Sequence, residues 1–409
     1  MRIQRFINEL CIFKHRASAT ENERRAAQHI YQIMRSLGLV AVIEEFKSQQ
    51  RMNWELATIL SFFLLSAVFY FFAPVVSAIL GIAGFILFWG YFTTSFKPLS
   101  PFFRFSKSQN VVGKFPNPDA PFKIVFTAHY DSARSSPLWN PKRVNLFRFN
   151  FLAGVGLMLA LVFMVALKPF SIEHPILNIA VVALGAFVVG QMVLQLYSGF
   201  SGKPVEGASD NASGVAVMLE MAARLKQKTM PLFEFWFVAT GSEEVGAIGM
   251  KEFLRAHADD FDKESSYFIN FDNIGSGTLH YFVGEGMLKL YRFSNDLILA
   301  AKKTTQLKKF QPVTSSTYRL AYTDAIIPSR LGYHAILLLA TDERGLIPHW
   351  HWETDTIQNI NFAVPELASD FCLKMTEELY QLISKQQKNK IQIMKNIQQE
   401  LSKNEESYL

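Results

Sequence analysis

Five short segments of the sequence carry acidic or imidazole side chains in positions suited to chemistry. Three of these segments close apolar runs, one precedes a predicted helix, and one follows the last apolar run. The residues are His129 and Asp131 in AHYDS, Asp210 in SDNASG, Glu243 and Glu244 in SEEVGAIG, Asp272 in FDNIG, and His351 and Asp355 in HWETDT. Ligands of an open α/β sheet gather at the carboxyl ends of its strands. The five segments together therefore predict one site.

Imidazole and carboxylate groups are ligands that zinc prefers, and a catalytic zinc site leaves one position open for water. Two zinc ions ~3.5–4 Å apart need a bridging carboxylate and further ligands for each ion. Such a set is supplied by His129, Asp210, Glu244, Asp272 and His351. A zinc-bound water has a pKa of about 7, and an adjacent carboxylate that binds no metal can act as general base. The set predicts a hydrolase that uses two zinc ions per chain.

The segment PHWHWETDT, residues 348–356, contains two histidines, His349 and His351. On its own this segment does not show which histidine binds a metal. On this segment alone an aromatic-rich loop that binds no metal is the commoner case, because a lone histidine is more often a surface or core residue.

An α/β pattern surrounds these segments. Apolar runs at 122–129, 231–240, 266–272 and 333–340 predict buried strands, and residues 39–46 predict another. Helices are expected at 21–37, where Thr20 and Glu23 form a capping box, and at 211–227, 246–258 and 287–303. The predicted fold is a mixed, largely parallel sheet flanked by helices.

Four runs without a charged residue interrupt this pattern, at 56–73, 75–96, 149–167 and 175–197. Each is close to the ~20 residues that cross the hydrocarbon core of a bilayer. They form two close pairs, which favours two transmembrane hairpins over buried core helices. The absence of charge inside the runs gives little support to a channel or transporter.

Basic residues lie mainly on one side of the predicted spans, namely Lys47, Arg51, Lys97, Arg104, Lys107, Lys142, Arg143, Arg148 and Lys203. The positive-inside rule then places both termini and every long soluble stretch in the cytoplasm. The net charge of +6 therefore calls for no nucleic-acid partner. Two cysteines form no disulfide framework, which also favours a reducing compartment.

The hairpins divide the chain into a discontinuous soluble domain and two insertions. We expect residues 1–53, 98–148 and 198–385 to form the soluble domain, 54–97 the first hairpin and 149–197 the second. Residues 386–409 read as a charged helical tail. A solvated end is the favoured interpretation of this tail, and self-association into a homo-oligomer is the alternative.

The soluble parts, about residues 16–48 and 108–385, resemble the co-catalytic di-zinc aminopeptidases, which are related to leucyl aminopeptidase, glutamate carboxypeptidase and glutaminyl cyclase. The resemblance rests on AHYDS, SDNASG, SEEVGAIG, FDNIG and HWETDT as a set, and it implies the zinc exopeptidase fold. It implies that His129 and Asp272 hold one zinc, that Glu244 and His351 hold the other, and that Asp210 bridges them. Glu243 would be the general base, and Asp131 would fix the imidazole of His129.

The family spacing from the last histidine to the Asp of DT selects His351 over His349. The sequence departs from the family at two positions: Trp350 replaces a tyrosine that can polarise the scissile carbonyl, and Ala325 replaces a histidine that many members carry after the acidic residue matched by Asp324. The hairpins are also outside the family pattern. Since the second enters between His129 and Asp210, the site is expected near the membrane surface.

The expected function is that of a membrane-anchored zinc aminopeptidase that acts on peptides in the cytoplasm. The nucleophile would be a hydroxide held by two zinc ions, and Glu243 would be its base. A glutaminyl cyclase-like acyltransferase with a single zinc is the enzymatic alternative. A receptor without catalysis on the same fold is the other, although such relatives lose ligands and none is lost here.

Overall fold

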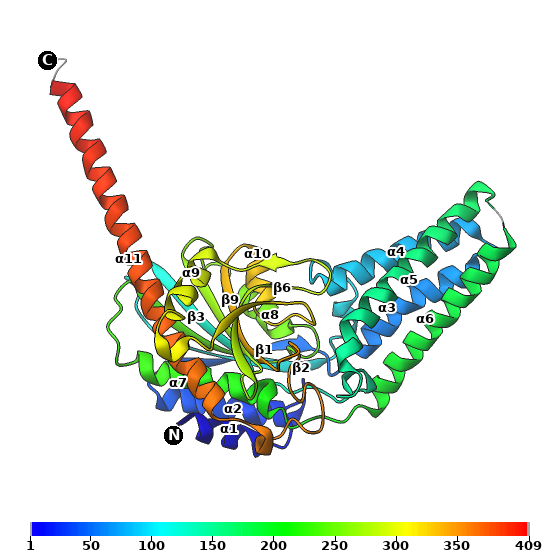
Figure 1. Ribbon diagram of the computed structural model, residues 1–409, viewed down its shortest axis with the longest axis horizontal. Coiled ribbons are helices and arrows are strands. Elements are labelled where there is room, and N and C mark those ends of the chain that lie inside the picture. Colours follow the sequence, from blue (N-terminus) through cyan, green and yellow to red (C-terminus); the bar gives the residue numbers. More distant parts are fainter. Residues whose placement is uncertain (1, 173, 407–409) are drawn as a thin grey trace.

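The computed structural model describes residues 2–172 and 174–406, and a mixed β-sheet forms its centre (Figure 1). Within the described residues the sheet has nine strands. Their bounds are β1 Val40–Ser48, β2 Ser106–Phe115, β3 Phe122–His129, β4 Phe233–Thr240, β5 Ser266–Asp272, β6 Thr278–Glu285, β7 Tyr291–Arg292, β8 Thr314–Tyr318 and β9 His334–Thr341.

The strand order is β1-β2-β4-β3-β5-β9-β6-β7, with β8 paired to β6. The central strands β4, β3, β5 and β9 run parallel to one another. Strands β2 and β6 flank this block as antiparallel partners of β4 and β9, and β1 pairs antiparallel with β2. Because parallel strands point the same way, the carboxyl ends of β3, β4 and β5 lie along one edge of the sheet. The predicted mixed, largely parallel sheet is thus observed.

Helices cover both faces of the sheet. The bounds are α1 Arg2–Cys11, α2 Glu21–Ser36, α3 Asn53–Phe69, α4 Pro74–Phe92, α5 Phe147–Leu167, α6 Pro175–Ser201, α7 Gly214–Leu225, α8 Ile248–Ala256, α9 Asn295–Thr304, α10 Ile326–Leu331 and α11 Ala363–Glu406. Successive residues of a strand belong to two apolar cores on opposite faces of the sheet. In β3, Phe126 belongs to the core that includes α1, α2, α7, α9 and α11, and Val125 belongs to the core that includes α8 and α10. The alternation follows from the two-residue period of a strand.

Helices α3 to α6 form a separate bundle that projects from the sheet domain (Figure 1). Among the described residues, three helical stretches are long and apolar enough to cross a membrane: Pro74–Phe92, Val144–Phe170 and Pro175–Ser201, with mean hydropathies of 2.1, 2.3 and 2.2. The middle stretch is α5 with its flanking 3-10 turns. The fourth expected span, α3, is apolar but has only 17 residues, so length and composition support three spans rather than the expected four.

The predicted strands at 122–129, 231–240, 266–272 and 333–340 are confirmed to within two residues at either end. The helix at 21–37 is also confirmed, and the Thr20 side chain accepts a hydrogen bond from the Glu23 backbone N–H. The helix expected at 287–303 is wrong in its first half, where residues 291–292 pair with β6 before α9 begins. The expected C-terminal helix is part of α11, whose backbone is helical to Glu406.

Candidate active site

The predicted site residues come together at the carboxyl edge of the sheet. His129 and Asp272 are the last residues of β3 and β5, and Glu243 and Glu244 follow the end of β4. Asp210 lies in the turn Ala208–Ser213 that leads into α7. His351 lies in the loop between β9 and α11.

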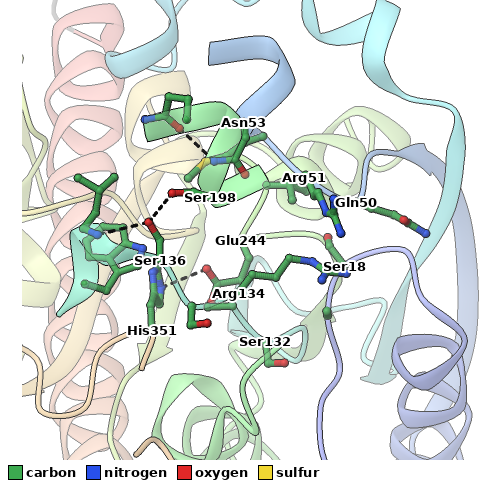
Figure 2. A pocket seen from close by; sticks show the side chains of 18 residues that line it. Ser18, Gln50, Arg51, Asn53, Ser132, Arg134, Ser136, Ser198, Glu244 and His351 are labelled. Atoms are coloured by element: carbon green, nitrogen blue, oxygen red, sulfur yellow. Dashed lines mark hydrogen bonds and ion pairs between the residues drawn. The ribbon is translucent and has the colours of Figure 1, made fainter. Parts of the chain in front are cut away.

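Asp210 lies between two pairs of side chains. Its Oδ1 is 3.1 Å from His129 Nε2, and that same nitrogen is 3.6 Å from Asp272 Oδ1. Its Oδ2 is 3.1 Å from His351 Nε2, which is also 3.1 Å from Glu244 Oε2. Figure 2 shows Glu244 and His351 turned toward one another. One carboxylate thus connects a His–Asp pair to a His–Glu pair.

Two further buried carboxylates hold the backbone of this cluster. Asp131 accepts hydrogen bonds from the backbone N–H groups of Glu243, at 2.9 Å, and Glu244, at 3.2 Å. Asp355 does the same for Ser209, at 2.7 Å, and Asp210, at 3.0 Å. Each carboxylate therefore fixes a pair of consecutive residues that includes a candidate metal ligand.

The ring of His129 is oriented by Asp131. Its Nδ1 is 3.1 Å from the Asp131 backbone carbonyl and 3.5 Å from the carboxylate. Because both partners only accept hydrogen bonds, the hydrogen sits on Nδ1 and the lone pair on Nε2 faces Asp210 and Asp272. This is the tautomer that binds a cation through Nε2.

The segment SDNASG is tied to the loop that follows β5. Asn211 Nδ2 donates to the Phe271 carbonyl at 2.8 Å, and Ser213 Oγ accepts from the Ile274 N–H at 3.0 Å. Ser209 Oγ accepts from the Gly275 N–H at 3.2 Å. The polar residues of this motif thus lock the Asp210 turn against the strand end that carries Asp272.

The two histidines of residues 348–356, His349 and His351, have different surroundings. The ring of His349 faces the Thr354 hydroxyl on the exposed side of the loop, at 2.8 Å from Nδ1. The ring of His351 lies within the cluster and packs edge-on against Trp139, with centroids 4.7 Å apart. Trp139 in turn contacts the buried ring of Trp350. The two tryptophans hold the imidazole of His351 toward Asp210.

Burial and neighbouring charges act in opposite directions on the pKa values of the cluster. Burial opposes charge on His351, but Glu244 and Asp210 raise the pKa of its imidazole to about 10. Burial raises the pKa of Glu244 to about 7, although His351 acts in the opposite direction. Burial also raises the pKa of Glu243 well above its ordinary value; His129 opposes this shift, whereas Asp324 and Glu244 add to it.

The residues present fit a divalent cation. His129, Asp210 and Glu244 each offer a ligand atom, and these atoms lie within 4.8 Å of one another. Two buried oxygens, Asp210 Oδ1 and Glu244 Oε1, have no hydrogen-bond donor among the described residues. Crowded carboxylates with unsatisfied oxygens and oriented imidazoles form the oxygen and nitrogen donor set that zinc prefers.

Several supporting residues were not identified from the sequence. In β2, Asn110 donates to the Gly249 carbonyl at 2.9 Å and accepts from the Gly241 N–H at 3.1 Å. Buried Glu23 accepts from the Ser242 N–H at 3.1 Å. These contacts support the loop that carries Glu243 and Glu244. The sequence singled out Glu23 only as part of a capping box. Its bond from Ser242 could not be predicted, because the two residues come together only in the folded chain.

Two cavities meet at Glu244 and His351. The larger, of about 550 Å³, lies between the cluster of candidate metal ligands and the helical bundle, and Glu243 is in its lining. The smaller, of about 80 Å³, has a mixed polar and apolar lining that includes Arg51 and Arg134 (Figure 2). Both cavities therefore border the candidate ligands Glu244 and His351.

The sequence of residues 192–376 matches the model of peptidase family M28. The alkaline phosphatase isozyme conversion protein of Escherichia coli K12 is 41% identical over 81 residues, covering 20% of this chain and 23% of that protein. An aminopeptidase of Pseudomonas aeruginosa is 36% identical over 80 residues, covering 20% and 15%. The chain therefore aligns with less than a quarter of the length of either relative.

Solved structures with a similar fold cover nearly the whole chain. The zinc aminopeptidase BSAP of Bacillus subtilis has a TM-score of 0.55 at 16% identity and covers 92% of this chain and 94% of its own. A glutaminyl cyclase of Porphyromonas gingivalis has a TM-score of 0.54 at 13% identity and covers 92% and 97%. At these identities the likeness concerns the fold.

Proposed function

Because residues 192–376 match the model of peptidase family M28, we propose that the chain is a membrane-anchored zinc aminopeptidase that hydrolyses N-terminal peptide bonds. The observation that carries this proposal is the position of Asp210 between the His129–Asp272 pair and the His351–Glu244 pair. A bridging carboxylate with one imidazole and one carboxylate on each side is the ligand set of a two-metal hydrolase.

In this proposal His129, Asp210 and Asp272 hold one zinc, and Asp210, Glu244 and His351 hold the other. When bound, zinc polarises the scissile carbonyl and makes water a stronger nucleophile at neutral pH. Asp131 and Asp355 are positioning residues, since they act through the backbone of the ligand segments.

Glu243 is proposed as the general base. It lies beside the ligand Glu244 and lines the larger cavity, where a substrate can reach it. Its carboxylate takes a proton from the attacking water and returns it to the leaving amine. Burial raises the pKa of Glu243 above its ordinary value, which makes its carboxylate a stronger proton acceptor.

The test is hydrolysis of leucine p-nitroanilide by the purified full chain, measured together with its zinc content. We expect turnover with two zinc ions per chain. Turnover should fall on replacement of Glu243 by Gln while the zinc content stays the same. Normal turnover by this variant would contradict the role of Glu243, and the absence of any aminoacyl hydrolysis by the native protein would contradict the peptidase proposal.

A glutaminyl cyclase-like activity is the second candidate, because a glutaminyl cyclase shares the fold. That reaction would need only one zinc and would convert an N-terminal glutamine into a pyroglutamyl group without consuming water. A peptide with a free N-terminal Gln separates the two activities: release of the glutamine supports the peptidase, and a loss of ammonia from the intact peptide supports the cyclase.

The membrane anchor is proposed to comprise all four helices α3 to α6, with the sheet domain in the cytoplasm. Apolar side chains such as Phe163, Ile179 and Val182 are exposed on the outside of the bundle, where lipid would cover them. Basic residues gather at the ends of the helices near the sheet domain, as the positive-inside rule requires. Digestion of the sheet domain by protease added outside sealed cells or right-side-out vesicles would overturn this orientation.

A further inference from the structure

The larger cavity joins two regions with different chemistry. At one end it is lined by Glu243, Glu244 and His351 of the catalytic cluster. At the other end its lining comes from all four bundle helices, with Leu60, Phe88, Phe151, Met158 and Phe187 among the residues. The cavity is therefore continuous from the candidate metal ligands into the interior of the bundle.

The bundle end of this cavity is mostly apolar. Besides the three catalytic groups, the described lining contains one charged residue, Arg143, and three amide side chains, Asn150, Gln191 and Gln195. A polar backbone or side chain placed among Leu, Phe and Met would lose its hydrogen bonds to water without replacement. An apolar segment would instead gain from burial, by about 25 cal/mol for each Å² removed from water.

We propose that the cavity binds the apolar segment of a membrane-associated peptide, so that the N-terminus of this peptide reaches the catalytic cluster from the bilayer side. The inference rests on the proposed peptidase function and specifies its substrate class. The volume of about 550 Å³ lies within the ordinary range of ligand sites, so the cavity can hold more than a single side chain. An apolar peptide partitioned into lipid would already be concentrated at the bundle.

Two glycines of α5 provide a matched test. A Cβ added at Gly154, which lines the cavity and is buried, would meet only Phe187 Cζ at 3.7 Å. A Cβ added at Gly156, two residues along the same helix, would meet nothing within 4 Å. Both positions accept a side chain, but only the one at Gly154 would project into the cavity lining.

The experiment measures the affinity of a fluorescent peptide, one alanine followed by four leucines, for the full chain in nanodiscs. Glu243→Gln is present throughout so that binding is separated from turnover. We expect Gly154→Leu to raise Kd by about tenfold or more and Gly156→Leu to leave it unchanged. A peptide in which serines replace the leucines should bind weakly to all variants.

Equal affinity of the Gly154→Leu protein and its parent for the leucine peptide would overturn the proposal. The proposal would also be overturned if the cavity bound a fatty acid but not the leucine peptide. Hydrolysis of alanine p-nitroanilide by the chain with native Glu243 is measured in parallel. Its absence would count against the peptidase function alone, because the binding result does not depend on it.

The smaller pocket carries a second inference from a different observation. Arg51 and Arg134 both line it, and the Nε atoms of both are buried without a hydrogen-bond partner. Among the described residues, no carboxylate forms an ion pair with either side chain. Figure 2 shows both arginines in the same pocket as Glu244 and His351. Burial and the nearby charge of Arg51 lower the pKa of Arg134, which agrees with two close cations that lack a counter-ion.

We infer that Arg51 and Arg134 bind a carboxylate of a second class of substrate, namely a short peptide whose residue after the scissile bond enters the smaller pocket and not the larger cavity. A guanidinium is a planar donor that matches a carboxylate, and such a bond is roughly twice as strong as a neutral one. The carboxylate could come from the C-terminus of a dipeptide or from an acidic side chain. This inference also rests on the proposed peptidase function.

The test compares kcat/KM within two pairs of substrates. The first pair is Leu-Gly and Leu-Gly-amide, and the second pair is Leu-Asp-amide and Leu-Asn-amide. We expect the native protein to favour the acid of at least one pair by about tenfold or more, and Arg134→Gln or Arg51→Gln to remove that preference. The first pair reports a terminal carboxylate and the second a side-chain carboxylate. Arg344→Gln, at an exposed loop position paired with Asp342, is the control. Acid-to-amide ratios near one in the native protein would refute the inference, whereas failure to cleave even the amides would refute the peptidase function.

Discussion

Replacement of Asp355 by Asn tests whether the backbone of the bridging residue is held by this carboxylate. Asp355 is 2% exposed and accepts two backbone hydrogen bonds, from Ser209 and Asp210, at 2.7 and 3.0 Å. Asn has the same shape but offers one acceptor oxygen. Its NH₂ group would face the other N–H, so that one bond is lost and two donors confront each other.

The magnitude follows from that lost bond. A hydrogen bond to a charged group contributes roughly 1.5–3 kcal/mol, and 1.4 kcal/mol corresponds to a factor of ten in an equilibrium constant. If the lost hydrogen bond lets the Asp210 turn move away from its metal-binding position, zinc affinity should fall by roughly 10- to 150-fold. Outer partners of metal ligands ordinarily change affinity by about 10–100-fold, which agrees with this range.

The assay is a zinc titration of the metal-free full chain against a chelator of known affinity. Asp342→Asn is the control, because Asp342 also accepts two backbone N–H groups, from Arg344 and Leu346, in a loop away from the cluster. We expect its zinc affinity to be unchanged. A zinc affinity for the Asp355→Asn protein within about twofold of the native value would refute the positioning role of this carboxylate.

Three further predictions concern the base, the metal and a distant histidine. Glu243→Gln should lower kcat by about 10²–10⁴-fold with little change in KM, as expected for loss of a general base, and steady-state kinetics on leucine p-nitroanilide measures both. Removal of zinc by dialysis against a chelator should abolish activity, and activity regained on titration with zinc should saturate at two ions per chain; saturation at one would contradict the two-metal site. His257 is bound to Glu44 at 2.8 Å and Asp260 at 2.7 Å, and the Glu44 contact raises its pKa despite partial burial. Because the pKa of His257 is raised in the folded state, its charged ring stabilises the folded protein fully below about pH 6.5. This contribution is lost as the pH rises through the folded-state pKa. His257→Gln should therefore lower the Tm at about pH 6 and have little effect at about pH 9, and an equal loss at both would contradict the charge argument.

The sequence was sufficient for the parallel centre of the sheet because those strands are buried on both faces. Their continuous apolar runs are the ordinary mark of such strands. Strand β2 was not predicted, since Ser108, Gln109 and Asn110 are polar and yet buried. These side chains are satisfied by partners far away in the chain, which no local pattern records.

The helix expected at 287–303 failed for a related reason. Residues 287–293 have apolar spacing compatible with a helix, but their backbone pairs instead with the end of β6 at Gly284 and Glu285. Phe293 N–H also donates to the Val283 carbonyl. The neighbouring strand thus overrides local propensity, as tertiary contacts commonly do.

For the site, residue types and order were enough to predict which side chains would meet, since strand ends share one edge of the sheet. The double hydrogen bonds made by Asp131 and Asp355 were not predictable in this way. Each depends on the direction of N–H groups in a distant loop. The two cavities depend on how the bundle packs against the sheet domain, and no motif in the sequence describes that packing.

The second helical pair has a consequence for the biogenesis of the protein. His129 is synthesised before α5 and α6, whereas Asp210, Glu244, Asp272 and His351 are synthesised after them. In a chain that inserts these helices, the ribosome must complete the second hairpin before the remaining ligands can join His129. If these helices insert into a bilayer as proposed, the metal site is therefore completed only after the chain has been anchored.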